Sequence, residues 1–212
     1  MTNDSHSRQD TRMRLLQVGV EIFARDGFRG ATVRSIARLA KANVAAVNYH
    51  FANKEGLYRA VLEHSFTVAM AKYPPDLGLE KTAGPAEQLH AFVTSMLLRL
   101  LDEGRPAWHG QLMIRELADP SPVLDRVVER TIRPLYERLA AIVGNLLGPT
   151  PSDETVRLSA FSIMGQCLFY RSSRPVVARL ARGRFDSARI RRIADHVTAF
   201  SLQAIQGQRN CS

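Results

Sequence analysis

The chain has 212 residues, of which 45% are hydrophobic, and it carries a formal net charge of +9 at pH 7. This length and composition suffice to bury a core and suit one small domain followed by a larger one. No apolar run approaches the roughly 20 residues that span a bilayer, and residues 1–10 lack the hydrophobic region of a secretion signal. We therefore expect a soluble cytoplasmic protein without a membrane partner, and the positive charge favours a polyanionic partner.

The chain begins with a polar segment that we expect to be a flexible arm over residues 1–10. Arg8, Arg12 and Arg14 could reach the groove or the phosphates of a nucleic acid, although a solvated tail explains residues 1–8 equally well.

Residues 32–54 are the most informative segment, because they predict two short helices separated by a tight turn. Thr32 can cap the first helix and Asn43 the second, which runs from Val44 to about His50. Four residues of the first helix recur at the spacing of one buried face, namely Val33, Ile36, Ala37 and Ala40. This layout is typical of a helix-turn-helix that reads DNA.

The second helix carries groups suited to bases and to phosphates. Its first residues are small, so it could lie deep in a major groove, and Asn48 could bond a base edge. Tyr49, His50 and Lys54 carry donors suited to phosphate oxygens. From periodicity alone, these could equally be surface residues of a helical bundle. The candidate DNA-binding residues are Thr32, Arg34, Asn43, Val44, Ala45, Ala46, Asn48, Tyr49, His50 and Lys54.

The order of these segments resembles the N-terminal domain of the TetR family of bacterial transcriptional repressors. The resemblance spans about residues 11–62 and includes LLQVGVEIFARDGFRGATV, SIARLA, NVAAVNYHF and NKEGLYRAVL. It implies an opening helix that packs through Leu16, Val20, Phe23 and Phe28 and ends at Gly27. One departure is Lys41, because the family usually has Gly in that turn. Lys41 must either accept a left-handed backbone or change the turn.

The rest of the chain is expected to be helical, without strands or internal repeats. Pro and Gly clusters separate the expected helices, which cover residues 53–72, 85–103, 107–118, 119–147, 154–173 and 187–206. The helix over 107–118 is apolar almost all round, so it should be central. Arg171 to Arg192 form a basic run that we interpret as a solvated connection and helix start. The prediction is an all-α protein of nine helices, with a three-helix DNA-binding domain over 1–54 and a six-helix domain over 55–212.

The second domain also carries a resemblance, to the C-terminal domain of the TetR subgroup typified by YbiH, also called CecR. It covers about residues 85–185 and rests on the segments MIRELADPSP and SIMGQCLFYRSSRPVV. The family resemblance implies a two-fold four-helix dimer interface built from the last two helices. Both helices could instead pack within one chain. The candidate interface residues are Leu158, Phe161, Ser162, Gly165, Phe169, Ile190, Ile193, Ala194, Val197 and Ser201.

A small-molecule pocket in the second domain is harder to locate, because Met and aromatic residues at helical spacing also build cores. Arg115 is the sharpest candidate, since an arginine in so apolar a helix needs a carboxylate partner or an anionic ligand. Its neighbour Glu116 points to another face of the helix. The candidate pocket residues are Phe66, Met70, Phe92, Met96, Trp108, Gln111, Leu112, Arg115, Tyr136, Gln166 and Tyr170.

Metal and enzyme chemistry find no support in the sequence. The six histidines form no i, i+4 pair, Cys167 is expected to pack as a small hydrophobe, and no catalytic motif is present. We expect no cofactor. The sequence predicts a homodimeric TetR-type repressor that binds a palindromic operator and is released by a small-molecule effector. The alternative is a helical architectural or interaction protein that binds DNA without sensing a ligand.

Overall fold

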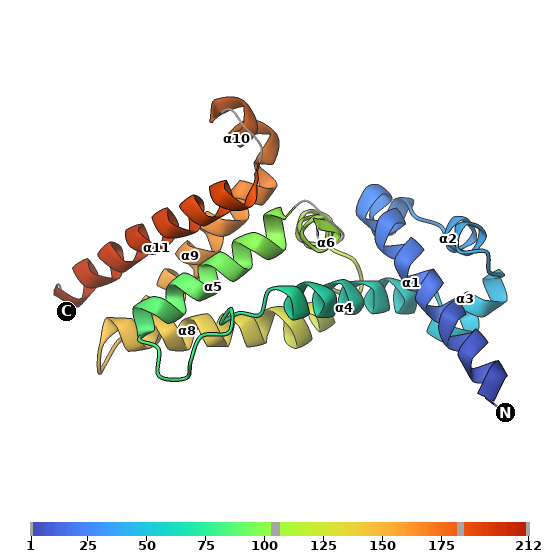
Figure 1. Ribbon diagram of the computed structural model, residues 1–212, viewed down its shortest axis with the longest axis horizontal. Coiled ribbons are helices and arrows are strands. Elements are labelled where there is room, and N and C mark those ends of the chain that lie inside the picture. The colour runs from blue at the N-terminus through green and yellow to red at the C-terminus, as the bar shows by residue number, and fades with distance from the viewer. Residues whose placement is uncertain (1, 103–106, 182–184, 211–212) are drawn as a thin grey trace. The chain divides into compact units, whose positions relative to one another are not determined.

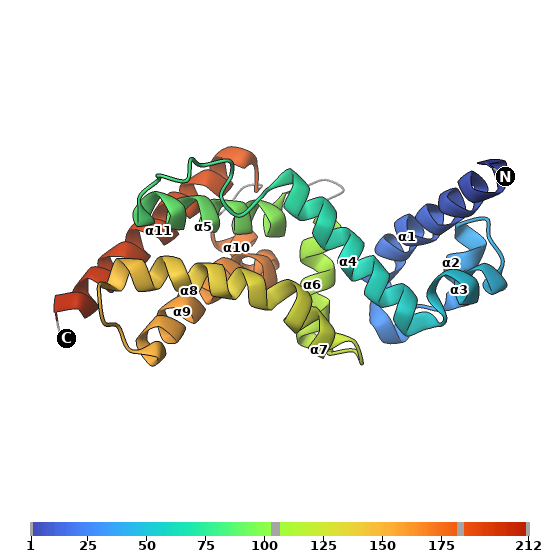
Figure 2. The same cartoon turned by 90° about the horizontal axis from the view of Figure 1, so that it is seen from below.

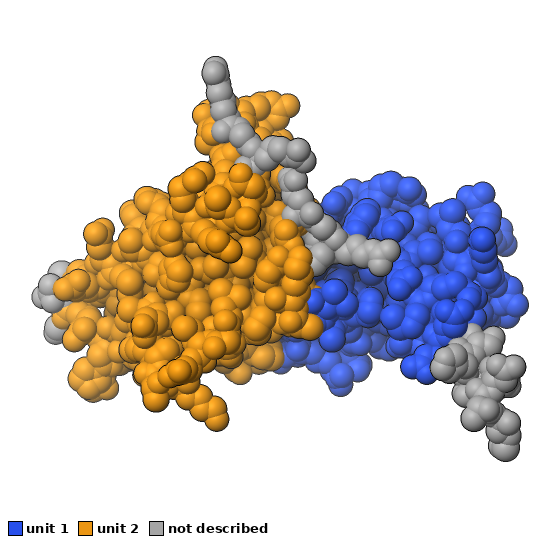
Figure 3. All heavy atoms as spheres, in the orientation of Figure 1, with its two compact units in different colours: residues 1–68, 108–131 blue, residues 69–107, 132–212 orange. Residues whose placement is uncertain are grey.

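The computed structural model describes residues 2–102, 107–181 and 185–210. Within these ranges the chain forms eleven α-helices and one π-helix, and no strand, which confirms the all-α prediction (Figure 1). It divides into two compact units, unit 1 with residues 1–68 and 108–131 and unit 2 with residues 69–107 and 132–212 (Figure 3). The compact units do not divide at residue 54, because most of α4 and the segment 108–131 belong with the first unit.

Unit 1 begins with α1 (Thr2–Gly30), α2 (Val33–Leu39), α3 (Val44–Phe51) and most of α4 (Lys54–Lys72). Helix α1 starts at Thr2, so the expectation of a flexible arm over residues 1–10 is wrong. That segment contains no Gly or Pro to stop a helix that extends from Thr11 onward. Gly27, with φ of 73°, interrupts α1 where the sequence predicts the helix to end.

The core of unit 1 explains the hydrophobic pattern of its sequence. Ile36, Ala37 and Ala40 are buried, as the predicted face of α2 requires. Phe23 and Tyr58 pack their rings with centroids 4.7 Å apart. Helices α6 (Ala107–Ala118) and α7 (Leu124–Val127) complete the unit.

Unit 2 is built from α5 (Pro85–Leu101), α8 (Arg133–Leu147), α9 (Asp153–Ser172) and α11 (Ser187–Asn210), which pack on one another around a shared core (Figure 2). The long helix expected over 119–147 is broken, because a π-helix (Val128–Ile132) lies between α7 and α8. Pro134 in the first turn of α8 has no N–H to donate, so the regular helix must restart there.

The structure adds α10 (Arg174–Leu180), which the sequence analysis did not predict. Pro175 stands in its first turn, a position where proline starts a helix and does not break it. Part of the basic run after Arg171 is therefore helical. No helix in the described ranges is long and apolar enough to cross a membrane.

Candidate nucleic-acid interface

Two side-chain caps start the helices of the helix-turn-helix, as the sequence predicts. The Thr32 hydroxyl accepts a hydrogen bond from the Ser35 N–H at 3.1 Å, and Asn43 Oδ1 accepts one from the Ala46 N–H at 2.7 Å. Each cap satisfies one of the backbone N–H groups that a helix start leaves unpaired. Because Asn43 Oδ1 is engaged in its cap, its amide nitrogen is the group left to contact DNA.

The turn between α2 and α3 contains Lys41 in a left-handed conformation, with φ of 51°. Of the two outcomes that the sequence leaves open, Lys41 therefore takes the strained backbone, at a cost of about 1 kcal/mol relative to glycine. The Ala42 N–H donates to the Ala37 carbonyl at 2.9 Å, which closes the end of α2.

Helix α3 presents one exposed face and buries the other. Val47 and Phe51 are buried and anchor the helix, whereas Tyr49 is 70% exposed. Four of the predicted DNA-binding residues are exposed at positions that share one side of the helix, namely Val44, Ala45, Asn48 and Tyr49. Ala46 and His50 are half-buried beside this face, while Thr32 and Arg34 are exposed on the approach to and start of α2.

A polar hollow of about 380 Å³ lies beside the C-terminal half of α3, and its lining includes Arg12, His50 and Arg59. The Arg12 guanidinium stands 5.4 Å from the centre of the Phe51 ring. Burial lowers the pKa of His50, and the positive charges of Arg12 and Arg8 lower it further. His50 is therefore neutral at pH 7 and can offer a phosphate one N–H.

Sequence reasoning missed Arg59 and Gly56, because both depend on how α4 crosses the end of α3. A Cβ on Gly56 would lie 1.9 Å from the Phe51 carbonyl oxygen, so only glycine fits there. Ala52, with φ of 67°, makes the sharp turn between the two helices. Gly56 donates its N–H to Oδ1 of the Asn53 cap at 2.8 Å. A glycine in the first turn of a helix was the available signal, because glycine is unfavourable for helix formation.

Lys54 is less free than the sequence suggests. Its ammonium donates to the Arg29 carbonyl at 3.3 Å and lies 4.7 Å from the centre of the Phe28 ring. These contacts hold the charge beside the end of α1, and its role at a phosphate stays a prediction.

The eleven candidate pocket residues are divided between the two units. In unit 1, Leu112 is fully buried and the Gln111 amide donates to the Ala24 carbonyl at 2.9 Å. Arg115 is exposed and donates to the Arg25 carbonyl, and its positive charge helps to lower the pKa of Asp26 on α1, so a carboxylate on another helix lies nearby. The expectation that α6 is central is wrong, because Arg115 and Leu117 of this helix are both exposed. The remaining unit 1 candidates are the half-buried Phe66 and Trp108.

A buried carboxylate beside Arg115 is the contact that sequence reasoning missed. Glu116 is 1% exposed, and it accepts hydrogen bonds from the Tyr58 hydroxyl at 2.8 Å and from the Ser121 N–H and hydroxyl at 3.1 and 2.8 Å. Burial, followed by the bond to Glu116, raises the pKa of Tyr58, so its hydroxyl stays protonated. The contact ties α6 to α4 within unit 1.

In unit 2, most of the candidate pocket residues contribute to packing. Phe92 lies in the core, Met96, Tyr136 and Tyr170 pack against it, and Met70 is half-buried. Gln166 donates to the Ser162 carbonyl at 3.4 Å and to the Ser201 hydroxyl at 3.5 Å. These residues therefore pack in the core of unit 2 or beside it.

The predicted dimer residues differ in exposure between the two helices, and their role in a dimer stays a prediction. Leu158, Phe161 and Phe169 of α9 are 55%, 53% and 51% exposed, Ser162 is exposed, and a Cβ on Gly165 would meet no atom within 4 Å. The stripe on α11 is buried inside unit 2, so these side chains pack within one chain, which is the alternative that the sequence left open. The residues concerned are Ile190, Ile193, Ala194, Val197 and Ser201. Beside this stripe, α11 exposes Phe200.

The arrangement of the side chains offers no support for a metal site among the described residues. In the part of the chain that the structure describes, no three His, Cys, Asp or Glu residues gather as a metal site would require. Cys167 is buried in the core of unit 2, and burial raises the pKa of its thiol to about 12. It packs as a small apolar residue, as the sequence predicts.

Two short helices, each started by a side-chain cap and joined by a tight turn, with the second helix exposed, define the class of helix-turn-helix DNA-binding proteins. The model of the tetR family of bacterial regulatory proteins matches residues 15–61, and that of the C-terminal domain of the HTH-type transcriptional dual regulator CecR matches residues 85–205. The chain belongs to the TetR family of transcriptional regulators, with a C-terminal domain of the CecR family.

Curated relatives extend over nearly the whole chain. The HTH-type transcriptional repressor NicS of Pseudomonas putida is 29% identical over 94% of this chain and 92% of its own. The HTH-type transcriptional dual regulator CecR of Shigella flexneri is 24% identical over 94% and 93%.

Solved structures share the fold. A transcriptional regulator from Rhodococcus sp. Rha1 matches with a TM-score of 0.68 at 20% identity, over 91% of this chain and 96% of its own. AibR in complex with isovaleryl coenzyme A and operator DNA matches with a TM-score of 0.66 at 19% identity, over 90% and 97%.

Proposed function

We propose that this regulator is a homodimeric repressor that binds a palindromic operator through α3 and leaves it when a small molecule binds. The observation that carries the proposal is the exposed face of α3, where Val44, Ala45, Asn48 and Tyr49 stand on one side. Small side chains at the start of the helix permit close approach to base edges, and Asn48 offers an amide that can pair with adenine. The name of the relative NicS supports repression. A regulator that binds an operator would act in the cytoplasm, and we propose that location.

The homodimer is supported by an exposed apolar face of α9. Leu158, Phe161 and Phe169 expose large side chains around the open position of Gly165, and Phe200 of α11 adds to the exposed apolar residues of unit 2. Exposed apolar clusters of this kind mark protein contacts. A two-fold copy would pair α9 with its own equivalent, and two recognition helices would then read two half-sites of a palindrome.

Binding of an effector is supported by AibR, a regulator of the same fold whose structure contains isovaleryl coenzyme A and operator DNA. In this chain, the bond from Tyr58 to the buried Glu116 couples α6 to α4, the helix that follows the recognition helix. A shift of α6 would therefore act on α4. A coupling free energy of about 1–3 kcal/mol is enough to change operator occupancy.

The proposal is tested by selecting DNA fragments from the source genome on the purified protein and measuring binding by fluorescence anisotropy. We expect a palindrome to be preferred over its scrambled sequence, with affinity that falls steeply as salt rises. Lys54→Ala should weaken binding to both duplexes alike. The control Lys81→Ala, at an exposed lysine of unit 2, should leave binding to both duplexes unchanged. Equal affinity for the palindrome and the scrambled duplex would refute the proposal. DNA that no small molecule releases would favour the architectural alternative.

A further inference from the structure

Helix α5 carries a buried arginine that the proposed function does not yet use. Arg99 is 3% exposed, and it lies near the end of α5 among Leu97, Leu100 and Leu101, which are buried as well. A buried charge is costly unless it is paired, and buried arginines normally face a carboxylate.

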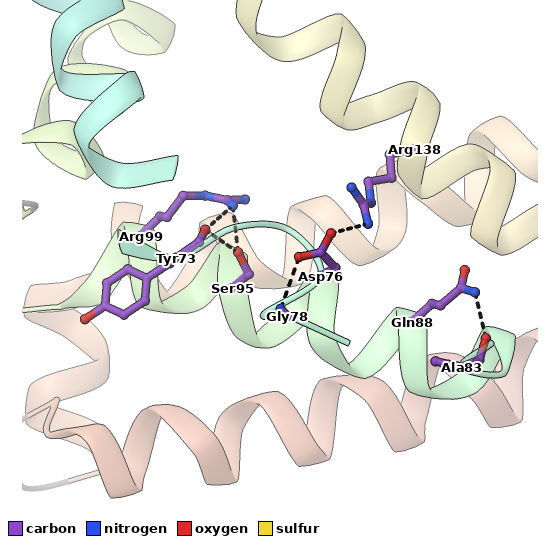
Figure 4. Close-up of polar contacts among 8 residues, drawn as sticks. All are labelled: Tyr73, Asp76, Gly78, Ala83, Gln88, Ser95, Arg99 and Arg138. Carbon is purple, nitrogen blue, oxygen red and sulfur yellow. Dashed lines mark hydrogen bonds and ion pairs between the residues drawn. The ribbon is translucent and has the colours of Figure 1, made fainter. Parts of the chain in front are cut away.

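Figure 4 shows Arg99 bonded to two neutral oxygens, those of the Tyr73 carbonyl and the Ser95 hydroxyl. Its Nη1 donates to the Tyr73 carbonyl at 3.0 Å and to the Ser95 hydroxyl at 2.7 Å, and that hydroxyl donates to the same carbonyl at 2.8 Å. These two bonds use both hydrogens of Nη1. The Nε and Nη2 N–H groups, which together can form a bidentate pair with a carboxylate, are bonded to none of the described residues.

No described carboxylate pairs with Arg99. Asp102, the next acid along the chain, accepts hydrogen bonds from the Lys72 ammonium and the Tyr73 hydroxyl, both at 2.7 Å. Burial lowers the pKa of Arg99 to about 10, so the side chain is still charged at neutral pH. The thiol of Cys167, which is close enough to influence this pKa, is protonated at that pH and offers no counter-charge.

A second arginine repeats the pattern on the neighbouring helix α9. Arg171 lies one turn after Cys167 and therefore on the same side of α9. It is half-buried, and burial and the charge of Arg174 lower its pKa. None of the described acids pairs with it. Unit 2 thus holds two partly or fully buried arginines that no described acid pairs with.

We propose that the Nε and Nη2 edge of Arg99 binds the carboxylate of a small acidic effector with an apolar body. This inference rests on the proposed function and names its ligand class. Arg99 already holds the carbonyl of Tyr73, the residue after the end of α4. A bound carboxylate would compete with the Tyr73 carbonyl for the Arg99 guanidinium and would reorient this side chain. The ligand would therefore change how the C-terminal end of α4 is anchored.

The test uses the full-length protein and matched acids and amides. Acetate, hexanoate, decanoate and benzoate are titrated by calorimetry and thermal shift beside their primary amides, which keep the shape and lose the charge. We expect at least one acid to bind with a Kd below about 10 mM, and its amide to bind at least about tenfold more weakly. Arg99→Gln should abolish that binding. Arg138→Gln, an exposed arginine of the same unit that pairs with Asp76 at 3.0 Å, should leave it unchanged.

Arg99→Lys keeps the charge and loses the planar fork, so it tests the site if Arg99→Gln does not fold. We expect the affinity for the acid to fall at least about tenfold in this variant. The inference is overturned if no acid binds, if an amide binds as well as its acid, or if both variants retain full affinity. These results leave the preference for a palindrome untouched. Loss of that preference in the wild-type protein would instead refute the proposed function.

Discussion

Replacing Tyr58 with Phe removes one oxygen from the buried contact between α4 and α6. The Tyr58 hydroxyl is the donor to Glu116 Oε2 at 2.8 Å, whereas Oε1 keeps both donors from Ser121. A hydrogen bond to a charged acceptor contributes about 1.5–3 kcal/mol, and here its loss also leaves a carboxylate oxygen buried without a donor. We expect Tyr58→Phe to lower the free energy of unfolding by about 2–3 kcal/mol.

The measurement is urea denaturation of the full-length protein, followed by circular dichroism. Tyr49→Phe is the matched control, because that ring is 70% exposed and its hydroxyl bonds to no described residue. It should change the free energy of unfolding by less than about 0.5 kcal/mol. A loss in Tyr58→Phe no greater than that of the control would refute the reasoning that this contact stabilises unit 1.

Three further predictions follow from single contacts. Gly56→Ala should lower the free energy of unfolding, measured by urea denaturation, by more than about 3 kcal/mol and abolish DNA binding, because the new Cβ would collide with the Phe51 carbonyl. Its control is Gly144→Ala, which has open space around it and should raise the free energy of unfolding by up to about 1 kcal/mol. Phe161→Glu should convert the dimer to monomers in sedimentation velocity, whereas the control Leu39→Glu, at an exposed apolar residue of α2, should leave the dimer intact. A dimer that persists in Phe161→Glu would exclude the exposed face of α9 as the interface. Burial lowers the pKa of His50 and His64 below 6.5 in the folded protein, so the unfolded chain takes up protons first and stability should fall as pH drops from about 7 to 5. His64→Gln should flatten that fall, and an unchanged pH profile would contradict it.

Local signals in the sequence predicted the helix-turn-helix well. The caps of Thr32 and Asn43 act on N–H groups three residues away, so their spacing alone identifies them. The buried face of α2 follows in the same way from a helical repeat. The left-handed turn at Lys41 was one of two outcomes that the sequence left open.

Contacts between distant segments could not be predicted from spacing. Gly56 and Arg59 gain their roles from the crossing of α3 and α4, and Glu116 gains its role from the return of α6 to unit 1. Arg99 is unremarkable in sequence, since its burial depends on four helices. The apolar stripe of α11 indicated burial correctly, but a stripe does not say whether it packs within the chain or against a second copy.

The central claim is that α3 reads DNA sequence through its exposed face, and Asn48 tests it most directly. The measurement is the ratio of affinities of wild type and Asn48→Ala for the selected palindrome and its scrambled sequence, at one salt concentration. We expect a ratio of at least about a thousandfold for the wild type. In Asn48→Ala the ratio should fall by about tenfold or more, with little change in affinity for the scrambled duplex. An unchanged ratio would contradict direct reading of DNA by this residue.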